Sequence, residues 1–144
     1  MSALFAFLHH VAAFALVSAI VVEFVLIRQE LNAVTARRLA LADMAVGISA
    51  GVLLVVGLLR VFYFEKGAAF YFNNAAFIAK LALFILVAAL SIYPTLKFLA
   101  WGKNPDMSAV PLVRRILHLE LVGVVLIVFC AALMARGIGF LGEK

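Results

Sequence analysis

The sequence has little charge and only one cysteine, and each scarcity excludes a class of protein. Charged residues make up 13% of the 144 residues and hydrophobic residues 68%. Soluble domains carry about 25% charged and about 45–50% apolar residues, so this composition indicates a protein embedded in lipid. The single cysteine, Cys130, excludes an internal disulfide, a cysteine-rich zinc site and an iron–sulfur cluster.

The sequence also lacks the motifs of hydrolases and nucleotide-driven proteins. It has no Ser-His-Asp set, no glycine-rich phosphate loop and no metal cluster. A net charge of +5 would favour nucleic acid in a soluble protein. Here the basic residues stand at the ends of apolar runs, so we expect lipid, and no nucleic acid, as the partner. No Lys or Arg precedes the long first apolar run, and we therefore expect no cleavable signal.

Four long apolar runs dominate the chain. Each is long enough to span a bilayer, which needs about 20 apolar residues in a helix. The connections between the runs are short, and short connections favour antiparallel neighbours. We therefore predict an all-α integral membrane protein, with one domain folded as an antiparallel four-transmembrane-helix bundle. The predicted helices cover about residues 4–27, 42–61, 75–97 and 113–135 of the single domain 1–144.

Lys and Arg are distributed unevenly between the two ends of this bundle. Cytoplasmic loops of membrane proteins carry an excess of these residues. We expect the end with the first and third connections to face the cytoplasm, with both termini outside. The basic residues of that end are Arg28, Arg37, Arg38, Lys97, Lys103, Arg114 and Arg115, and those of the other end are Arg60, Lys66, Arg136 and Lys144.

Lys80 is the one charged residue between Ala75 and Tyr93. A charge within the bilayer costs about 2.5 kcal/mol or more on insertion scales, so it should face the bundle interior and have a partner. Snorkelling is the alternative, because Lys80 lies about 8 Å from the start of the run, close to the reach of its stem. The partner of the Lys80 amine is therefore the central question that the sequence raises.

Polar residues fall into two layers, on the order of 12 Å apart by the helical rise. The outer layer lies toward the predicted outside and contains His9, His10, Arg60, Asn73, Asn74 and Lys80. The inner layer lies toward the predicted cytoplasm and contains Glu23, Asp43, His118 and Glu120.

Helical phase, at about 100° per residue, relates these residues further. Glu23 and His9 share a helix face to within roughly 40°, whereas His10 points roughly 140° away from Glu23. If Glu23 faces inward, as a carboxylate in lipid must, His9 does too. By the same count Asn73 shares the face of Lys80.

Each of these residues also has a plain structural explanation. His9 and His10 suit the membrane interface, and Glu23 can pair with a loop arginine such as Arg37 or Arg38. His118 can belong to a basic helix start next to lipid phosphates. Its two-residue separation from Glu120 turns the two side chains to different faces, unlike a helical metal motif.

Nitrogen donors on two helices at one depth can hold a flat molecule between them. Neutral imidazole is a common ligand of haem iron, and either His9 or His10 can supply it. A deprotonated Lys80 amine can ligate the iron from the other side. Arg60 and Asn73 can meet the propionates, because arginine is the natural partner of a carboxylate. The residues therefore suggest a site for haem b.

Two segments carry a resemblance to known families. GLLRVFYFEKGAAFYFNN and FIAKLALFILVAALSIYPTLKF resemble a family of small bacterial four-helix membrane proteins of unknown function. The chain is more distantly similar to HemJ-type protoporphyrinogen oxidases and to CopD-like membrane proteins. The HemJ-type pattern has a histidine early in helix one and a K-L-x-L start to helix three, matched by His9 or His10 and by Lys80. Its tryptophan in helix one is missing, and Tyr93-Pro94 stands where it has a later histidine.

This resemblance implies haem ligation by His9 or His10 and Lys80, and a place in the bacterial inner membrane. Our leading hypothesis is a b-type haem-binding, redox-active membrane protein, which as an enzyme would be an oxidoreductase with an electron-transfer partner. The alternative is a non-redox membrane protein, either a small transporter or a structural or lipid-binding subunit. Gly47 and Gly51 have the spacing that lets helix backbones approach closely, so a homo-oligomer stays open.

Overall fold

The computed structural model describes residues 2–142 and confirms the predicted all-α fold. In this part of the chain four helices are long and apolar enough to cross a membrane. Lys144, counted above in the charge balance, lies outside the described residues. The elements are α1 (Ser2–Leu26), α2 (Ala33–Leu59), the π-helical η1 (Arg60–Phe64), α3 (Ala68–Phe72), α4 (Ala75–Trp101), the 3₁₀-helical η2 (Met107–Ala109) and α5 (Val110–Ala135).

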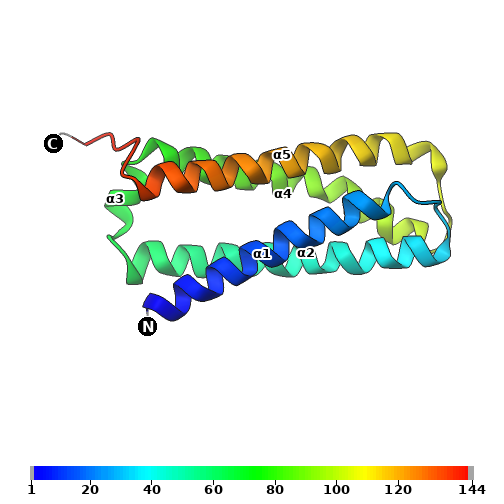
Figure 1. The fold of residues 1–144 in the computed structure, drawn as a ribbon, viewed down its shortest axis with the longest axis horizontal. Helices are drawn as coiled ribbons and strands as arrows, with labels where there is room; N and C mark the ends of the chain where they lie inside the picture. The colour runs from blue at the N-terminus through cyan, green and yellow to red at the C-terminus, as the bar shows by residue number, and fades with distance from the viewer. Residues whose placement is uncertain (1, 143–144) are drawn as a thin grey trace.

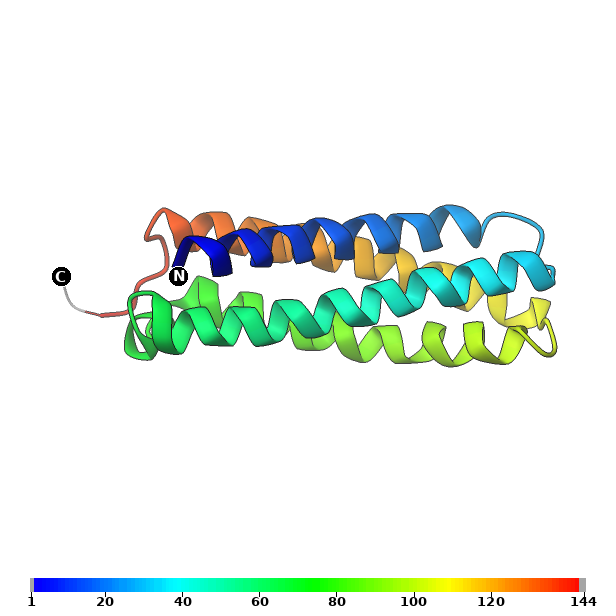
Figure 2. The same ribbon diagram turned by 90° about the horizontal axis from the view of Figure 1, so that it is seen from below.

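The four long helices form an elongated antiparallel bundle (Figure 1). Contacts are most extensive within two hairpins, α1 with α2 and α4 with α5, and fewer contacts join α2 to α4 and α1 to α5. Both termini and α3 lie at one end, which we call the terminal end, and the α1–α2 and α4–α5 connections lie at the opposite end (Figure 2). The bundle is therefore two hairpins packed side by side.

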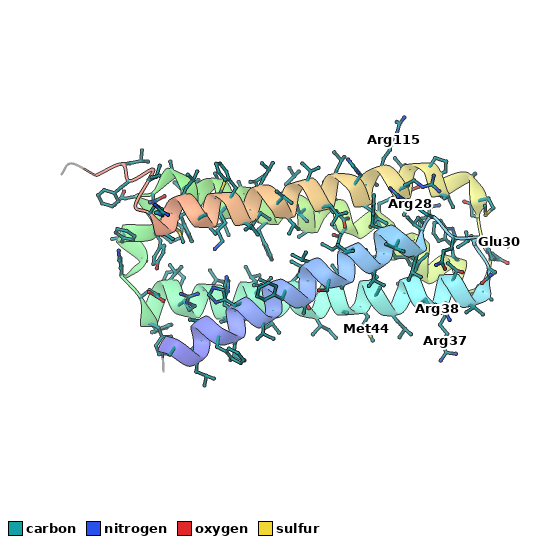
Figure 3. All side chains as sticks on the ribbon, viewed as in Figure 1. Arg28, Glu30, Arg37, Arg38, Met44 and Arg115 are labelled. Atoms are coloured by element: carbon teal, nitrogen blue, oxygen red, sulfur yellow. The ribbon has the colours of Figure 1, made fainter. Side chains whose placement is uncertain are left out.

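The helices extend further than the apolar runs predicted, most clearly at the start of α2. This helix begins at Ala33 rather than near residue 42, because the Asn32 side chain accepts a hydrogen bond from the Thr35 amide (2.9 Å) and caps it there. A helix of 27 residues is about 40 Å long and exceeds a hydrocarbon core of about 30 Å. Because α2 begins at Ala33, Arg37 and Arg38 lie on this helix and not in a loop. Their side chains point away from the bundle (Figure 3).

The predicted loop between the second and third spans is also largely helical. It contains the π-helical turn η1 and the short helix α3. Aromatic rings hold this segment together: Phe62 packs on Phe72 at 6.4 Å between ring centroids, and Phe70 stacks on Phe140 of the C-terminal tail at 5.4 Å. Hydropathy did not reveal these turns because polar residues such as Glu65, Lys66 and Asn73 interrupt the apolar run, which is also typical of a loop.

Asn74 fixes the start of α4 and ties it to the C-terminal tail. The side chain is fully buried, and its Oδ1 accepts hydrogen bonds from the amides of Ala76 (2.9 Å) and Phe77 (3.2 Å). The tail then returns along this cap: the Ala75 amide donates to the Gly139 carbonyl, and the Leu141 amide donates to the Asn73 carbonyl, both at 2.7 Å. The α4–α5 hairpin is therefore closed at the terminal end as well as at its connection.

The described residues form three buried apolar clusters, of which a small one (Val61, Tyr71 and Phe77) lies at the terminal end and two larger ones follow it along the bundle. The first of the two larger clusters, which we call the mid-bundle cluster, includes Leu16, Ile20, Val46, Leu53, Val87 and Val124. The second lies toward the opposite end, and we call it the loop-end cluster; it includes Ile27, Leu39, Phe98, Trp101, Val113 and Leu117.

Within this chain close helix packing involves Gly123 and does not involve Gly47 and Gly51, whose role in contact with a second copy stays open. A Cβ added at Gly123 would overlap the Val87 side chain, so the absence of a side chain lets α5 approach α4. A Cβ at Gly47 or Gly51 would meet no atom within 4 Å. The spacing of the pair was therefore no guide to packing within this chain.

We predict that Gly123→Val destabilises the bundle while Gly51→Val does not. Overpacking at Gly123 should cost about 1–3 kcal/mol, because Val87 or the α5 backbone must move. The matched Gly51→Val carries the same helix-propensity change on an open face. Thermal denaturation of both proteins in detergent measures the difference, and equal midpoints would contradict this packing.

Asn74→Ala should also lower stability, by about 1–2 kcal/mol, because α4 loses its cap and buried amides lose their acceptor. The neighbouring Asn73→Ala is the control, since the Asn73 side chain is exposed and its backbone carbonyl is kept. The same denaturation midpoints measure both variants. A larger effect at Asn73 would refute the assigned roles.

Candidate functional site

A cavity of about 330 Å³ lies near the terminal end, between the two hairpins. Its size falls within the range of about 300–1,000 Å³ that is usual for small-molecule pockets. Most of its wall is apolar and comes from all four long helices, with Leu16, Leu53, Phe84 and Val124 among the lining residues. Four of the polar residues singled out in the sequence also line it: His9, His10, Arg60 and Lys80.

His9 is the more enclosed of the two histidines. Its ring packs against the backbone of α2 at Gly57, where an added Cβ would lie 3.4 Å from His9 Cε1. Its Nδ1 is buried and has no hydrogen-bond partner among the residues described. Buried polar atoms are rarely left in this state, and His9 Nδ1 lies on the side of the ring that faces Gly57.

His10 is exposed and is held by its own helix. Its Nδ1 lies 2.6 Å from the Ala6 carbonyl oxygen, so this nitrogen carries the proton and donates. The rings of His9 and His10 are 6.3 Å apart and nearly perpendicular, at 87°. The question that the sequence left open, which histidine faces inward, is thus decided by burial in favour of His9.

Lys80 is half-buried on α4 and faces the same cavity. Within residues 2–142 its amine takes part in neither of the two ion pairs and in no side-chain hydrogen bond. The partner expected for a lysine at this depth is therefore absent from that part of the chain. Lys80, Arg60 and His9 lie within electrostatic range of one another, and they concentrate basic groups at one side of the wall.

Arg60 reaches the cavity from the first residue of η1. π-helical turns at the end of α-helices often occur at functional sites, because the wider turn redirects side chains. The guanidinium also pairs with Glu65 through Nη2 and Oε1 at 2.7 Å, and both side chains are partly exposed. Arg60 is therefore partly neutralised at the mouth of the cavity.

Asn73 does not share the face of Lys80, contrary to the helical-phase prediction. The prediction assumed one continuous helix through both residues, but α3 ends before Asn73 and α4 begins at Ala75. Asn73 is exposed and is not part of the cavity wall. Its neighbour Asn74 serves as the cap described above.

Tyr71 and Gly57 are the cavity residues that the sequence did not reveal. Tyr71 lies on α3, is buried, and packs on Phe77 at 5.3 Å between ring centroids. Burial raises the pKa of the Tyr71 phenol, so its hydroxyl stays protonated and able to donate. The sequence alone does not distinguish Tyr71 from the other aromatic residues around it, or Gly57 from the other glycines of α2. Only the packing of the helices does so.

In the structure the inner layer contains fewer residues than predicted. Glu23 and Glu120 are each 1% exposed, and half-buried Asp43 lies 2.7 Å from the Thr95 hydroxyl. His118 lies outside this layer. It is exposed, and its ring packs on that of Phe24 with 5.9 Å between the ring centroids. The suggested pairing of Glu23 with Arg37 or Arg38 is not formed, because both arginines lie on the outer face of α2.

The arrangement can bind a largely apolar molecule that carries acidic groups. Imidazole, amine, guanidinium and phenol converge on one apolar cavity from α1, α4, η1 and α3, and none of the lining residues is acidic. The donor set fits haem, whose ring is apolar, whose iron accepts nitrogen ligands and whose propionates are anionic.

The chain was compared with known proteins at the level of families, curated proteins and solved structures. No curated protein and no solved structure matches it. Residues 1–139, nearly the whole sequence, match the family described as predicted membrane protein (DUF2214). The chain, with four helices able to span a bilayer, therefore belongs to this family of membrane proteins of unknown function.

Proposed function

We propose that the protein binds haem b in the terminal-end cavity and serves in electron transfer within the membrane. The observation that carries this proposal is the meeting of His9, Lys80 and Arg60 in one apolar cavity, although they come from three separate elements. Haem bound there would supply one-electron redox chemistry.

His9 is the proposed iron ligand because its imidazole is the more enclosed of the two and lines the cavity. Gly57 leaves room for the ring against α2. Lys80, on α4 across the bundle, is the proposed second ligand. An amine without an ion-pair partner among the described residues is available for that role, or for contact with a propionate.

Arg60 is proposed to hold a propionate at the mouth of the cavity. Guanidinium groups bind carboxylates well, and Arg60 already holds the Glu65 carboxylate, because Nε (3.3 Å) and Nη2 (2.7 Å) both donate to Oε1. A propionate would replace Glu65 or share the guanidinium with it. The apolar lining of the cavity would exclude water from the rest of the porphyrin ring.

The surroundings of the site support a place in a bacterial inner membrane with both termini outside the cytoplasm. Seven Lys and Arg side chains belong to the opposite end or its approaches, and those described at the terminal end are Arg60, Lys66 and Arg136. This orientation would put the haem near the outer leaflet, within reach of an electron-transfer partner on that side.

The first test is the visible spectrum of the protein purified in detergent, before and after dithionite. We expect a Soret band that shifts on reduction. His9→Ala should weaken haem binding by about 100-fold or more, since even changes behind a ligand cost 10–100-fold. Added imidazole should restore the band in His9→Ala, because a free ligand can occupy the vacated space.

His118→Ala is the matched control, because His118 is an exposed histidine outside the cavity. Its haem content should equal that of the unaltered protein. A preparation that is colourless, and stays colourless after haem is added, would refute haem binding. Loss of colour in His9→Ala without rescue by imidazole, in a protein that has also lost its folded size on gel filtration, would assign His9 a structural role.

A second prediction concerns the wall behind His9. Gly57→Leu should lower haem occupancy, because the new side chain would occupy the space next to His9 Cε1. Gly47→Leu makes the same change on α2 where no atom lies within 4 Å, so its occupancy should be unchanged. The ratio of Soret absorbance to protein measures both. Equal occupancy in the two variants would place the ligand elsewhere.

The basic cavity also favours a second candidate, the binding of an acidic amphiphile without redox chemistry. This candidate rests on the charge of the cavity lining, which includes basic residues and no acidic residue. A colourless protein whose denaturation midpoint rises with a long-chain fatty acid, but not with the corresponding alcohol, would support this candidate over haem.

A further inference from the structure

The inner layer forms an acidic cluster in the middle of the bundle. Each long helix contributes polar side chains at this depth: Glu23 from α1, Asp43 from α2, Ser91 and Thr95 from α4, and Glu120 from α5. The carboxyl groups of Glu23, Asp43 and Glu120 lie within electrostatic range of one another.

Apolar residues flank this acidic cluster on both sides along the bundle axis. On every long helix, one residue of the mid-bundle cluster and one of the loop-end cluster flank the polar position. The flanking pairs are Ile20 and Ile27 on α1, Val46 and Leu39 on α2, Val87 and Phe98 on α4, and Val124 and Leu117 on α5. The carboxyl groups therefore lie between two apolar layers of the bundle.

No cation compensates the acidic cluster within residues 2–142. The ion pairs of this part of the chain join Arg60 to Glu65 and Lys97 to Asp106. The other basic groups on the same halves of the helices face outward and are exposed: Arg28 on the connection after α1, Arg37 and Arg38 on α2, and Arg114, Arg115 and His118 on α5. Tyr93 on α4 is half-buried, carries no positive charge and packs against the loop-end cluster.

Two of the carboxyl groups are buried with an unmet oxygen. Glu23 and Glu120 are each 1% exposed, and Oε1 of each has no hydrogen-bond partner in the described chain. Two or three ionised carboxylates without a cation would cost many kcal/mol in such surroundings. Protons are the smallest charge that removes this cost, and they need no additional space.

The hydrogen bonds around Thr95 point to a proton as well. Its Oγ1 lies 2.7 Å from Asp43 Oδ1 and 2.9 Å from the Ser91 carbonyl oxygen. A hydroxyl has one hydrogen and can donate fully to only one of these acceptors. Both contacts are satisfied together when Asp43 is protonated and donates to Thr95, which then donates to the Ser91 carbonyl.

We propose that Glu23, Asp43 and Glu120 form a proton-binding site in the interior of the bundle, in which the carboxyl groups hold protons and not a metal cation at neutral pH. Thr95 orients the Asp43 carboxyl group, and the mid-bundle and loop-end clusters flank the site. This site is separate from the terminal-end cavity and does not depend on haem being bound there.

Infrared spectroscopy tests this site directly, because the carbonyl stretch of a protonated carboxyl group is distinct from the bands of carboxylates. The protein is measured at pH 7 in a detergent without ester groups. We expect a protonated-carboxyl band that loses part of its area in Glu23→Gln and part in Glu120→Gln, and most of it in the double variant. Glutamine keeps the size of glutamate, so packing should change little.

Glu30→Gln is the matched control, because Glu30 is exposed in the α1–α2 connection and should be ionised at pH 7. Its spectrum should retain the full protonated-carboxyl band. Labelling the unaltered protein with ¹³C-glutamate should move the Glu23 and Glu120 part of the band and leave the Asp43 part in place. This labelling needs no substitution and therefore tests the site even if a variant fails to fold.

The opposite results are equally clear. Absence of a protonated-carboxyl band at pH 7, or a band that neither the double variant nor the label alters, would overturn the proposal. Ionised carboxylate bands together with a denaturation midpoint that rises with NaCl, but not with choline chloride, would assign a sodium site instead. Neither outcome bears on the Soret band, so the haem proposal stands or falls separately.

Discussion

A bilayer interior offers no water to polar groups, and this constraint decides where every polar residue of the bundle lies. Backbone amides at helix starts are met by Asn32 and Asn74, so the helices can begin at defined positions. Arginines stay at the surface of the helix ends. Side chains that remain inside must find a partner, a proton or a ligand, and each of the two polar layers meets this requirement differently. Most of the outer layer lines the cavity, whereas the inner layer lies between two apolar clusters.

The two layers carry opposite charge character yet do not neutralise each other. Lys80 and His9 line the cavity, while Glu23 and Glu120 lie beyond the mid-bundle cluster. In a medium of low dielectric constant, basic and acidic groups attract strongly over several ångströms, and direct contact would consume both as a salt bridge. The mid-bundle cluster prevents this contact. It therefore keeps the basic groups and the acidic groups apart within one small bundle.

The spans, the antiparallel order and the depth of the polar residues could be predicted from sequence, because hydropathy and helical rise depend on local composition. The phase relation of His9 and Glu23 could also be followed, since α1 runs unbroken through both residues. The same reasoning failed for Asn73, which a helix break separates from Lys80. It could not separate Gly123 from Gly47 and Gly51, or find the contact of Thr95 with Asp43. These features depend on which helices meet, and that information lies in the packing of distant segments.

The return of the C-terminal tail onto the start of α4 makes the two hairpins mechanically unequal. The α4–α5 hairpin is fastened at both ends, by its connection and by the backbone hydrogen bonds of Ala75 and Leu141. The α1–α2 hairpin has a covalent connection at the opposite end, and at the terminal end α1 packs on η1 through the stacked rings of Phe5 and Phe64. Among the described residues no backbone hydrogen bond of this kind ties the start of α1 to another segment. We therefore expect the terminal end of the α1–α2 hairpin to separate from the bundle more readily than that of the α4–α5 hairpin.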